Sequence, residues 1–497
     1  MNTPLRRVAM AVMVMIVALL VNATYVQVQI GPIGKADSLR NDPRNDRVLL
    51  DEYARQRGQI SASGTVLASS VATDDRYKYM RTYPTDPLAY SAVTGFYSLQ
   101  NGSNGIEHAE DSVLNGSDNQ LFGRRLIDMI SGRDPRGGNV ITTLNPIMQK
   151  VAYEQLTAKN FTGSVVAIEP STGRILTMVS TPSYDPNLLA GHDGAATQKT
   201  WEQLQADPRQ PMLNRAVSQT YPPGSTFKVI VSAAALSNGV AKPDDQFTAS
   251  PRITLPDTTT TLENYNGTHC GPGDGQTASM TDAFKYSCNT AFAEIGMKTG
   301  AAKLKDEANA FGIGTQHPNI PIPWADSTVG TIPDQAALAQ SSIGQRDVAL
   351  TPLDNAVVAA TIANGGVRMK PYLVDQLQAP DLSTLESTKP TSVGQAVSPQ
   401  VATQITTLML ASEQNTTGGT APRSYQIASK TGTAEHGDDP RNTPPHAWYI
   451  AFAPAQNPKI AIAVIVENGG DRALAATGGS VAAPIARAVL DAGLQGG

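Results

Sequence analysis

One segment near the middle of the chain constrains the fold more than any other, because residues 225–236 are apolar on nearly every side. The residues Pro222-Pro223-Gly224 interrupt regular structure just before this segment. Asn238-Gly239 marks its end. A helix that is apolar around its whole circumference must be buried, so we expect a central helix of a large domain. With 497 residues, 40% of them hydrophobic, the chain is long enough to bury it.

Two pairs of β-rich segments lie on either side of this helix in the sequence. Residues 164–168 and 174–179 flank a five-residue turn, and residues 448–453 and 459–466 flank a Pro-rich turn. Apolar runs of this length around a turn predict hairpins of buried strands. A sheet built from early and late segments, with helices between them, predicts an α+β domain in which an antiparallel sheet is flanked by helices.

The first motif with candidate chemistry opens the buried helix. Ser225 and Lys228 are three residues apart, so their side chains share one helical face. Burial lowers the pKa of an amine, and a neutral lysine can accept the proton of a serine nucleophile. The alternative is a capping serine beside a solvated lysine, but the neighbours Phe227, Val229 and Ile230 favour burial of Lys228.

The second motif is Ser287-Cys288-Asn289, which lies between the helix-like segments 281–286 and 290–297. In an extended loop, residues i and i+2 point the same way. Ser287 can then relay a proton while Asn289 binds a substrate amide. Taken alone, this motif is weak evidence for a site.

The third motif is Lys430-Thr431-Gly432-Thr433, in a segment that a strand follows. A lysine beside hydroxyl groups can receive a carboxylate. A glycine in a strand lets a ligand backbone approach closely. Taken alone, the motif is better explained as an exposed strand end with a solvated lysine.

Chance copies of two motifs test this interpretation. Residues 117–119 spell S-D-N in an irregular region, and residues 298–300 spell K-T-G where Gly300 is better explained as a helix stop. Order, spacing and context therefore carry the argument, since the three motifs fall on a buried helix, a loop between helices and a strand.

In this order, the motifs resemble those of the class B penicillin-binding proteins, and most of all the actinobacterial penicillin-binding protein A group. The chain departs from the usual S-D-N pattern at Cys288. The resemblance covers about residues 35–490. It includes further segments at 57–60, 105–107, 163–187, 221–228, 342–345, 351–352 and 363–366.

The resemblance implies a penicillin-binding/β-lactamase-like serine transpeptidase domain over residues 146–497. It also implies a small, mostly β pedestal, similar to a dimerisation domain, over residues 29–145. We use the word pedestal for that region below. A transmembrane anchor over 8–28 and a cytoplasmic tail over 1–7 complete the expected organisation.

The N-terminal apolar run supports the anchor. Arg6 and Arg7 precede an apolar run over 8–21 that continues more weakly to residue 28, just long enough to span a bilayer. A cleaved signal peptide, with a site near Val21-Asn22-Ala23, is the alternative. Positive charges stay inside, so the rest of the chain is exported in both cases. The resemblance favours a single-pass protein of the bacterial cell membrane whose catalytic domain is extracytoplasmic.

The implied activity is that of a peptidoglycan D,D-transpeptidase, which cross-links stem peptides. Ser225 would attack the carbonyl between two terminal D-alanines, and Lys228 would take its proton. Ser287 would pass protons to the leaving amine, Asn289 would hold the donor amide, and Lys430 would set the local field. Thr431, Gly432 and Thr433 would line the place of the terminal carboxylate, and the backbone N–H groups of Ser225 and Thr433 would form the oxyanion hole.

The implied partners are peptidoglycan stem peptides, β-lactam antibiotics that acylate the same serine, a membrane-embedded glycan polymerase and other division or elongation proteins. A D,D-carboxypeptidase, a β-lactamase-like hydrolase and a non-catalytic penicillin-sensing scaffold are the alternatives. A net charge of −5 without a basic block argues against nucleic acid as a partner. We expect no metal or other cofactor, because the six histidines lack zinc-hydrolase spacing and two cysteines cannot form an all-cysteine zinc site.

The two cysteines have two possible states. Cys270 and Cys288 lie 18 positions apart in an exported chain, where disulfides persist. A bridge between them would hold the loop 268–275 beside the cleft, whereas two separate buried thiols are the alternative. We do not expect a thiol nucleophile, because no histidine pairs with either cysteine in the sequence.

Overall fold

The computed structural model describes residues 3–30, 53–123, 130–131, 136–273, 275–317, 320–440 and 442–495. They form two compact units, Met1–Gln56 with Val71–Met80, and Arg57–Ser70 with Arg81–Gly497. The polar start of the expected pedestal, at residues 31–52, lies outside the described residues.

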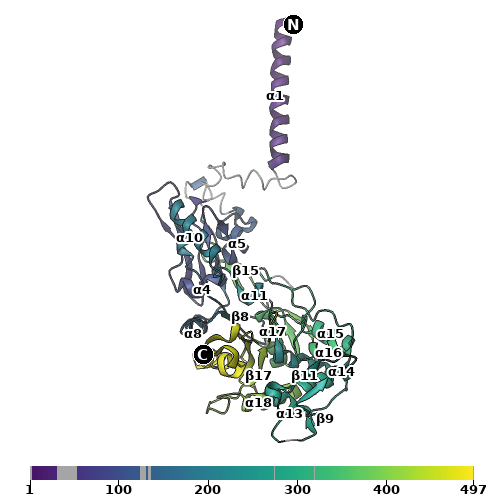
Figure 1. Ribbon diagram of the computed structural model, residues 1–497. Helices are drawn as coiled ribbons and strands as arrows, with labels where there is room; N and C mark the ends of the chain where they lie inside the picture. The colour runs from purple at the N-terminus through teal and green to yellow at the C-terminus, as the bar shows by residue number, and fades with distance from the viewer. Residues whose placement is uncertain are drawn as a thin grey trace. The chain divides into compact units, whose positions relative to one another are not determined.

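The N-terminal segment is one long helix, α1 (Thr3–Ile30), which contains the predicted anchor (Figure 1). Within the described residues, no single helix meets the length and hydropathy required to cross a membrane. A bent pair, Glu467–Ala475 with Gly478–Gln495, meets both criteria only when its halves, 113° apart, are taken together. The anchor over residues 8–28 stays a prediction.

The centre of the second unit is a five-stranded antiparallel sheet in the order β17-β18-β19-β7-β8. Both predicted hairpins are confirmed, and the early and late segments meet where Val165 of β7 pairs with Val464 of β19. The strands are β7 (Gly163–Ile168), β8 (Ile175–Thr181), β17 (Ala428–Ala434), β18 (His446–Ala453) and β19 (Ile460–Val466).

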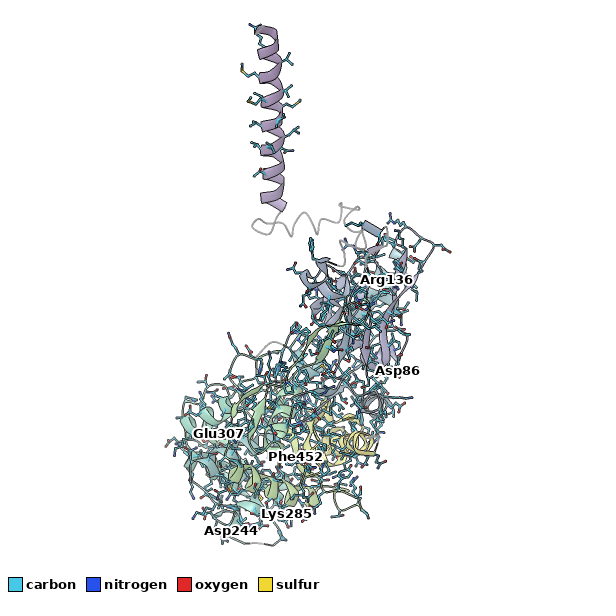
Figure 2. The ribbon with its side chains drawn as sticks, turned by 180° about the vertical axis from the view of Figure 1, so that it is seen from behind. Asp86, Arg136, Asp244, Lys285, Glu307 and Phe452 are labelled. Carbon is cyan, nitrogen blue, oxygen red and sulfur yellow. A yellow bond between two sulfur atoms is a disulfide. The ribbon has the colours of Figure 1, made fainter. Side chains whose placement is uncertain are left out.

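Helices cover both faces of this sheet, because alternate residues of its buried strands point to opposite sides. On β19, Ile462 and Val464 join the core beneath α8 (Pro146–Thr157) and α19 (Ala483–Gln495). Ala461 and Ala463 join the other core, which α17 (Pro352–Ala363) covers. Figure 1 shows the C-terminal end beside α8, and Figure 2 labels Phe452 of β18 within this part of the molecule.

The predicted central helix is confirmed. It starts as a 3-10 turn, η2 (Gly224–Phe227), and continues as α12 (Lys228–Ser237), which is buried from Lys228 to Leu236. The helices packed around α12 are α14 (Asn289–Thr299), α15 (Ala301–Ala310) and α18 (Pro399–Asn415). The shorter helices of this part are α9 (Asn187–Ala190), α10 (Gly194–Ala206), α11 (Arg215–Ser218), α13 (Met280–Lys285) and α16 (Gln335–Ser341).

Three two-stranded ribbons lie in the chain segments between these helices. They are β9 (Gln246–Thr248) with β12 (Thr277–Ser279), β10 (Arg252–Thr254) with β11 (Thr261–Glu263), and β13 (Val367–Met369) with β16 (Ser392–Gln395). Lys285 and Asp244, labelled in Figure 2, lie at this end of the second unit, far from Asp86 and Arg136 at the other end.

The pedestal region holds a six-stranded sheet in the order β15-β14-β6-β1-β2-β3. Two of its strands, β14 (Val374–Gln378) and β15 (Thr384–Ser387), come from the later chain. The sequence did not predict this, because both strands are short and mostly polar. The other strands are β1 (Ile60–Ala62), β2 (Thr65–Ala72), β3 (Tyr79–Thr82) and β6 (Asn139–Thr142), and this region also holds β4 (Tyr97–Ser98), β5 (Gly102–Ser103), α4 (Pro87–Thr94), α5 (Gly105–Ala109) and α6 (Asp111–Leu114).

A buried charge cluster stabilises this region. Glu107, fully buried, lies 2.6 Å from Arg57 Nε through one carboxylate oxygen and 2.6 Å from Arg81 Nε through the other. Burial alone would raise the pKa of Glu107, but the two guanidinium groups hold it below its usual value. The resembling segments 57–60 and 105–107 are therefore joined in space.

Candidate active site

The nucleophile candidate Ser225 lies in the turn that leads into α12, and its side chain lines a cleft. Gly224, with φ of +52°, precedes it and donates its N–H to Gly344 O at 2.9 Å. A Cβ at Gly224 would lie 2.8 Å from Thr433 O, so glycine lets the turn approach β17 closely. The turn and β17 therefore meet at Ser225.

Lys228 is fully buried one turn further along. Its Nζ donates to Ser287 O at 2.7 Å and to Asn289 Oδ1 at 2.8 Å, and lies 3.4 Å from Ser287 Oγ. Burial, together with the nearby charge of Lys430, holds the pKa of Lys228 well below its usual value. These contacts, rather than one to Ser225 Oγ, engage Lys228 Nζ here. They join the first and second motifs.

Ser287 lies between the two lysines of the site. Its Oγ accepts from Lys430 Nζ at 2.8 Å and from Lys228 Nζ at 3.4 Å. Its φ of +59° is in the left-handed region that non-glycine residues rarely adopt, and such conformations cluster at functional sites. Ser287 thus joins the two lysines at the wall of the cleft.

Lys430 is buried in β17, and burial lowers its pKa to about 7. Thr431 and Thr433 line the cleft. A Cβ at Gly432 would lie 2.9 Å from Pro223 O, so the missing side chain makes room for the turn that carries Ser225. The approach of a ligand backbone to Gly432 stays a prediction.

The cleft has a volume of about 1210 Å³, and Ser225, Ser287, Asn289, Thr431 and Thr433 all line it. Lys228 and Lys430 lie just beneath its surface. The structure therefore brings all five candidate catalytic residues together, with both threonines of the third motif. Lining residues that sequence reasoning missed include Thr416, Thr417, Leu474 and Thr477, because no local pattern identifies loops brought together by the fold.

The second motif is fixed to one wall of the cleft. A disulfide joins Cys270 to Cys288, in agreement with the bridged alternative. Asn289 Nδ2 donates to Glu263 O at 2.9 Å, and the buried Asn264 accepts from Thr290 N–H at 3.0 Å. The loop after β11 is thus held against the start of α14.

The chance copies of the motifs lie elsewhere. Asp118 caps a short 3-10 turn of the pedestal region by accepting from Gln120 N–H. Gly300, with φ of +89°, ends α14 as expected. Neither copy contributes to the cleft.

The two histidines after the third motif stack on each other, with ring centroids 3.8 Å apart. His446 is buried at the start of β18. Burial and the neighbouring His436 lower the pKa of His446 to about 3, and its Nδ1 accepts from Asn468 N–H. His446 is therefore a neutral structural residue.

Comparisons with known proteins agree with this geometry. Residues 163–491 match the family model of the penicillin binding protein transpeptidase domain, and residues 57–140 match that of the penicillin binding protein A dimerisation domain. Over 100% of both chains, the sequence is 62% identical to peptidoglycan D,D-transpeptidase PbpA of Mycolicibacterium smegmatis.

Two solved structures of penicillin-binding protein A from M. tuberculosis are similar to this fold. The ceftriaxone acyl-enzyme complex has a TM-score of 0.87 and 57% identity, and the match covers 89% of this chain and 99% of that chain. The penicillin G acyl-enzyme complex has a TM-score of 0.85 and 57% identity, covering 88% and 100%. The matched domains, together with the cleft in which the three motifs meet, show that this chain belongs to the penicillin-binding protein transpeptidase family.

Proposed function

We propose that the protein is a serine-type peptidoglycan D,D-transpeptidase that works through an acyl-enzyme on Ser225. The observation that carries the proposal is the pair of buried lysines that contact Ser287, in a cleft that Ser225 and Ser287 both line. The names of its full-length relatives favour a transpeptidase over a hydrolase or a penicillin-sensing scaffold.

In the acylation step, Ser225 Oγ attacks the carbonyl carbon between two terminal D-alanines, and its proton passes to neutral Lys228. The low pKa of Lys228 keeps its amine ready to accept that proton. The backbone N–H groups of Ser225 and Thr433 would stabilise the oxyanion. Because Gly224 brings the turn close to β17, the two N–H groups belong to adjacent segments.

The C–N bond then breaks and D-alanine leaves. Its amine takes a proton through Ser287, which contacts both lysines. Lys430, when protonated, would attract the terminal carboxylate, with Thr431 and Thr433 as hydroxyl donors. An amine of a second stem peptide attacks the ester carbon and forms the new C–N bond. The C–O bond to Ser225 breaks, and the proton lost by the amine passes through Lys228 to Ser225 Oγ.

β-Lactams present a strained amide in place of the D-Ala-D-Ala end. The M. tuberculosis relatives are described as ceftriaxone and penicillin G acyl-enzyme complexes. We infer the same covalent attachment at Ser225 of this chain, which makes a labelled penicillin a direct probe of the nucleophile.

We also propose that residues 8–28 anchor the protein as a single span, with the pedestal and transpeptidase domains outside the cytoplasm. An apolar helix at α1 and the peptidoglycan substrate support this arrangement. A membrane-embedded glycan polymerase, which would supply the strands to be cross-linked, is the partner implied by the resemblance to class B penicillin-binding proteins.

Fluorescent-penicillin labelling of the purified protein tests the proposal. Wild type should be labelled stoichiometrically, and Ser225→Ala should not be labelled although it folds. Ser218→Ala, which removes an exposed serine of α11, is the matched control and should label like wild type.

A donor–acceptor assay with stem peptides then separates cross-linking from hydrolysis. Cross-linked product that depends on Ser225 supports the transpeptidase. Labelling of Ser225→Ala would contradict the nucleophile assignment, and rapid release of label with hydrolysed donor alone would favour a hydrolase.

A further inference from the structure

A buried carboxylate lies behind the strand that carries the third motif. Glu413, near the end of α18, is 4% exposed. Its Oε2 accepts from Ser429 Oγ at 2.5 Å and from Tyr449 Oη at 2.6 Å. Its Oε1 accepts from Arg487 Nε at 2.9 Å, and Arg487 Nη2 lies 2.7 Å from the same oxygen. One carboxylate therefore joins α18, two strands and the C-terminal helix.

Such an arrangement is not explained by stability alone. Glu413 and Arg487 are both about 5% exposed or less, so both charges lose most of their hydration. Apolar residues of similar volume are often at least as stabilising as a buried ion pair. The ion pair differs from apolar residues in that its hydrogen bonds hold the partner groups at defined distances and angles.

The first of these contacts fixes β17 next to Lys430. Ser429 directly precedes Lys430, and successive side chains of a strand point to opposite faces. Glu413 therefore holds the back of the strand, while Lys430 Nζ reaches Ser287 Oγ at 2.8 Å on the other face. Because β17 is an edge strand, only β18 pairs with it in the sheet.

The second contact fixes a wall of the cleft. Arg487 Nη1 donates to Thr417 O at 2.6 Å, so the ion pair reaches this segment through the arginine. The backbone N–H of Thr416 donates separately to the backbone carbonyl of Glu413 at 3.0 Å. Thr416 and Thr417 both line the cleft that holds Ser225. The same ion pair therefore supports the strand of Lys430 through Glu413 and the cleft wall at Thr417 through Arg487.

We propose that Glu413 and Arg487 are positioning residues of the acylation reaction, which hold β17 through Ser429 and the cleft wall through Thr417. The proposal rests on the function given above. It makes the C-terminal helix α19 part of the support of the active site, although none of the three motifs lies on it.

The sharpest test compares two hydroxyl deletions on the same carboxylate oxygen. Ser429→Ala removes the contact beside Lys430, whereas Tyr449→Phe removes the contact from β18 and is the matched control. We measure the second-order rate constant of acylation by fluorescent penicillin, its pH profile, and the melting temperature of each full-length variant.

Ser429→Ala should slow acylation about tenfold or more, because small displacements of reacting groups have large effects on rate. Its pH profile should also shift, since Lys430 changes its distance from Ser287. Tyr449→Phe should acylate within about twofold of wild type with an unshifted profile, even if both variants melt at similarly reduced temperatures.

A second variant tests the arginine. Arg487→Lys keeps a positive charge for Glu413 but cannot also reach Thr417 O with a planar fork of donors. Compared with Arg487→Ala, Arg487→Lys should recover much of the wild-type melting temperature. It should recover less of the wild-type acylation rate.

Equal acylation rates for Ser429→Ala and wild type would overturn the proposal. The proposal would also be overturned if Ser429→Ala and Tyr449→Phe lost acylation rate in the same proportion to their loss of melting temperature. That result would indicate a purely structural role. If folded wild type is not labelled by penicillin at all, the proposed function fails instead, and the two failures are thereby distinguishable.

Discussion

At the scale of the residue, the site is defined by two lysines that have little access to water. Lys228 and Lys430 are both fully buried, and both contact Ser287. Desolvation disfavours the charged form of an amine, so each lysine is closer to neutrality than a surface lysine. Burial therefore gives the site two amines that can act as bases near neutral pH.

The pKa of about 7 for Lys430 predicts how stability depends on pH. The folded-state pKa lies below the unfolded value of 10.5, so between about pH 7 and pH 10.5 the unfolded chain binds the extra proton. Stability contributed by Lys430 should therefore rise with pH across that window, and be lost again as pH falls towards 7.

Chemical denaturation of wild type and Lys430→Met at several pH values checks this. Relative to wild type, the free energy of unfolding of Lys430→Met should be most favourable at pH 7. As pH rises, wild type should gain stability over the variant. A difference that stays constant from pH 7 to pH 10 would show that the pKa of Lys430 is not depressed.

At the scale of the element, the site depends on how closely the turn of Ser225 approaches β17. Gly224 and Gly432 remove side chains from the two facing surfaces. The sequence predicted Ser225, Lys228, Ser287, Asn289 and Lys430, because three short motifs occur in the order, spacing and context of a known family. It did not predict that Gly432 faces Pro223, or that Glu413 supports Ser429, because those contacts join distant segments and have no local pattern.

Gly432→Ala should separate these two elements. The new Cβ would lie 2.9 Å from Pro223 O and 3.0 Å from Thr226 Cγ2, so the strand or the turn must shift. We expect a stability loss of about 1–3 kcal/mol from overpacking and a fall in acylation rate of about tenfold or more.

Penicillin acylation kinetics and thermal melting measure both effects. Gly191→Ala is the matched control, since a Cβ there meets no atom within 4 Å and its φ of −66° suits alanine. Wild-type kinetics in Gly432→Ala would show that the turn and β17 tolerate a wider spacing.

At the scale of the whole molecule, a buried amide joins the pedestal region to the central sheet. Gln149 of α8 is fully buried, and its Nε2 donates to Ala89 O and Met178 O, each at 2.8 Å. Its Oε1 accepts from Met178 N–H at 2.9 Å. Ala89 belongs to α4 and Met178 to β8, so one side chain satisfies backbone groups of both regions.

Gln149→Met keeps the side-chain length and removes these three hydrogen bonds. Buried backbone groups left without partners should lower the free energy of unfolding by about 3 kcal/mol. Urea denaturation measures the loss. Lys150→Met, whose side chain is 60% exposed on the same helix, is the control and should change stability little. Equal stability of the two variants would show that the amide does not hold the regions together.

The order of strands in the central sheet has a consequence for the time at which the enzyme becomes reactive. Strand β7 has β8 on one side and β19 on the other, so its second edge stays open until almost the whole chain has been made. Pairing over such a sequence distance is slow to form. Ser225 and Ser287 are synthesised before β17 brings Lys430 to them. A chain that ends before β17 thus carries Ser225 and Ser287 but lacks the lysine that contacts Ser287 from that strand.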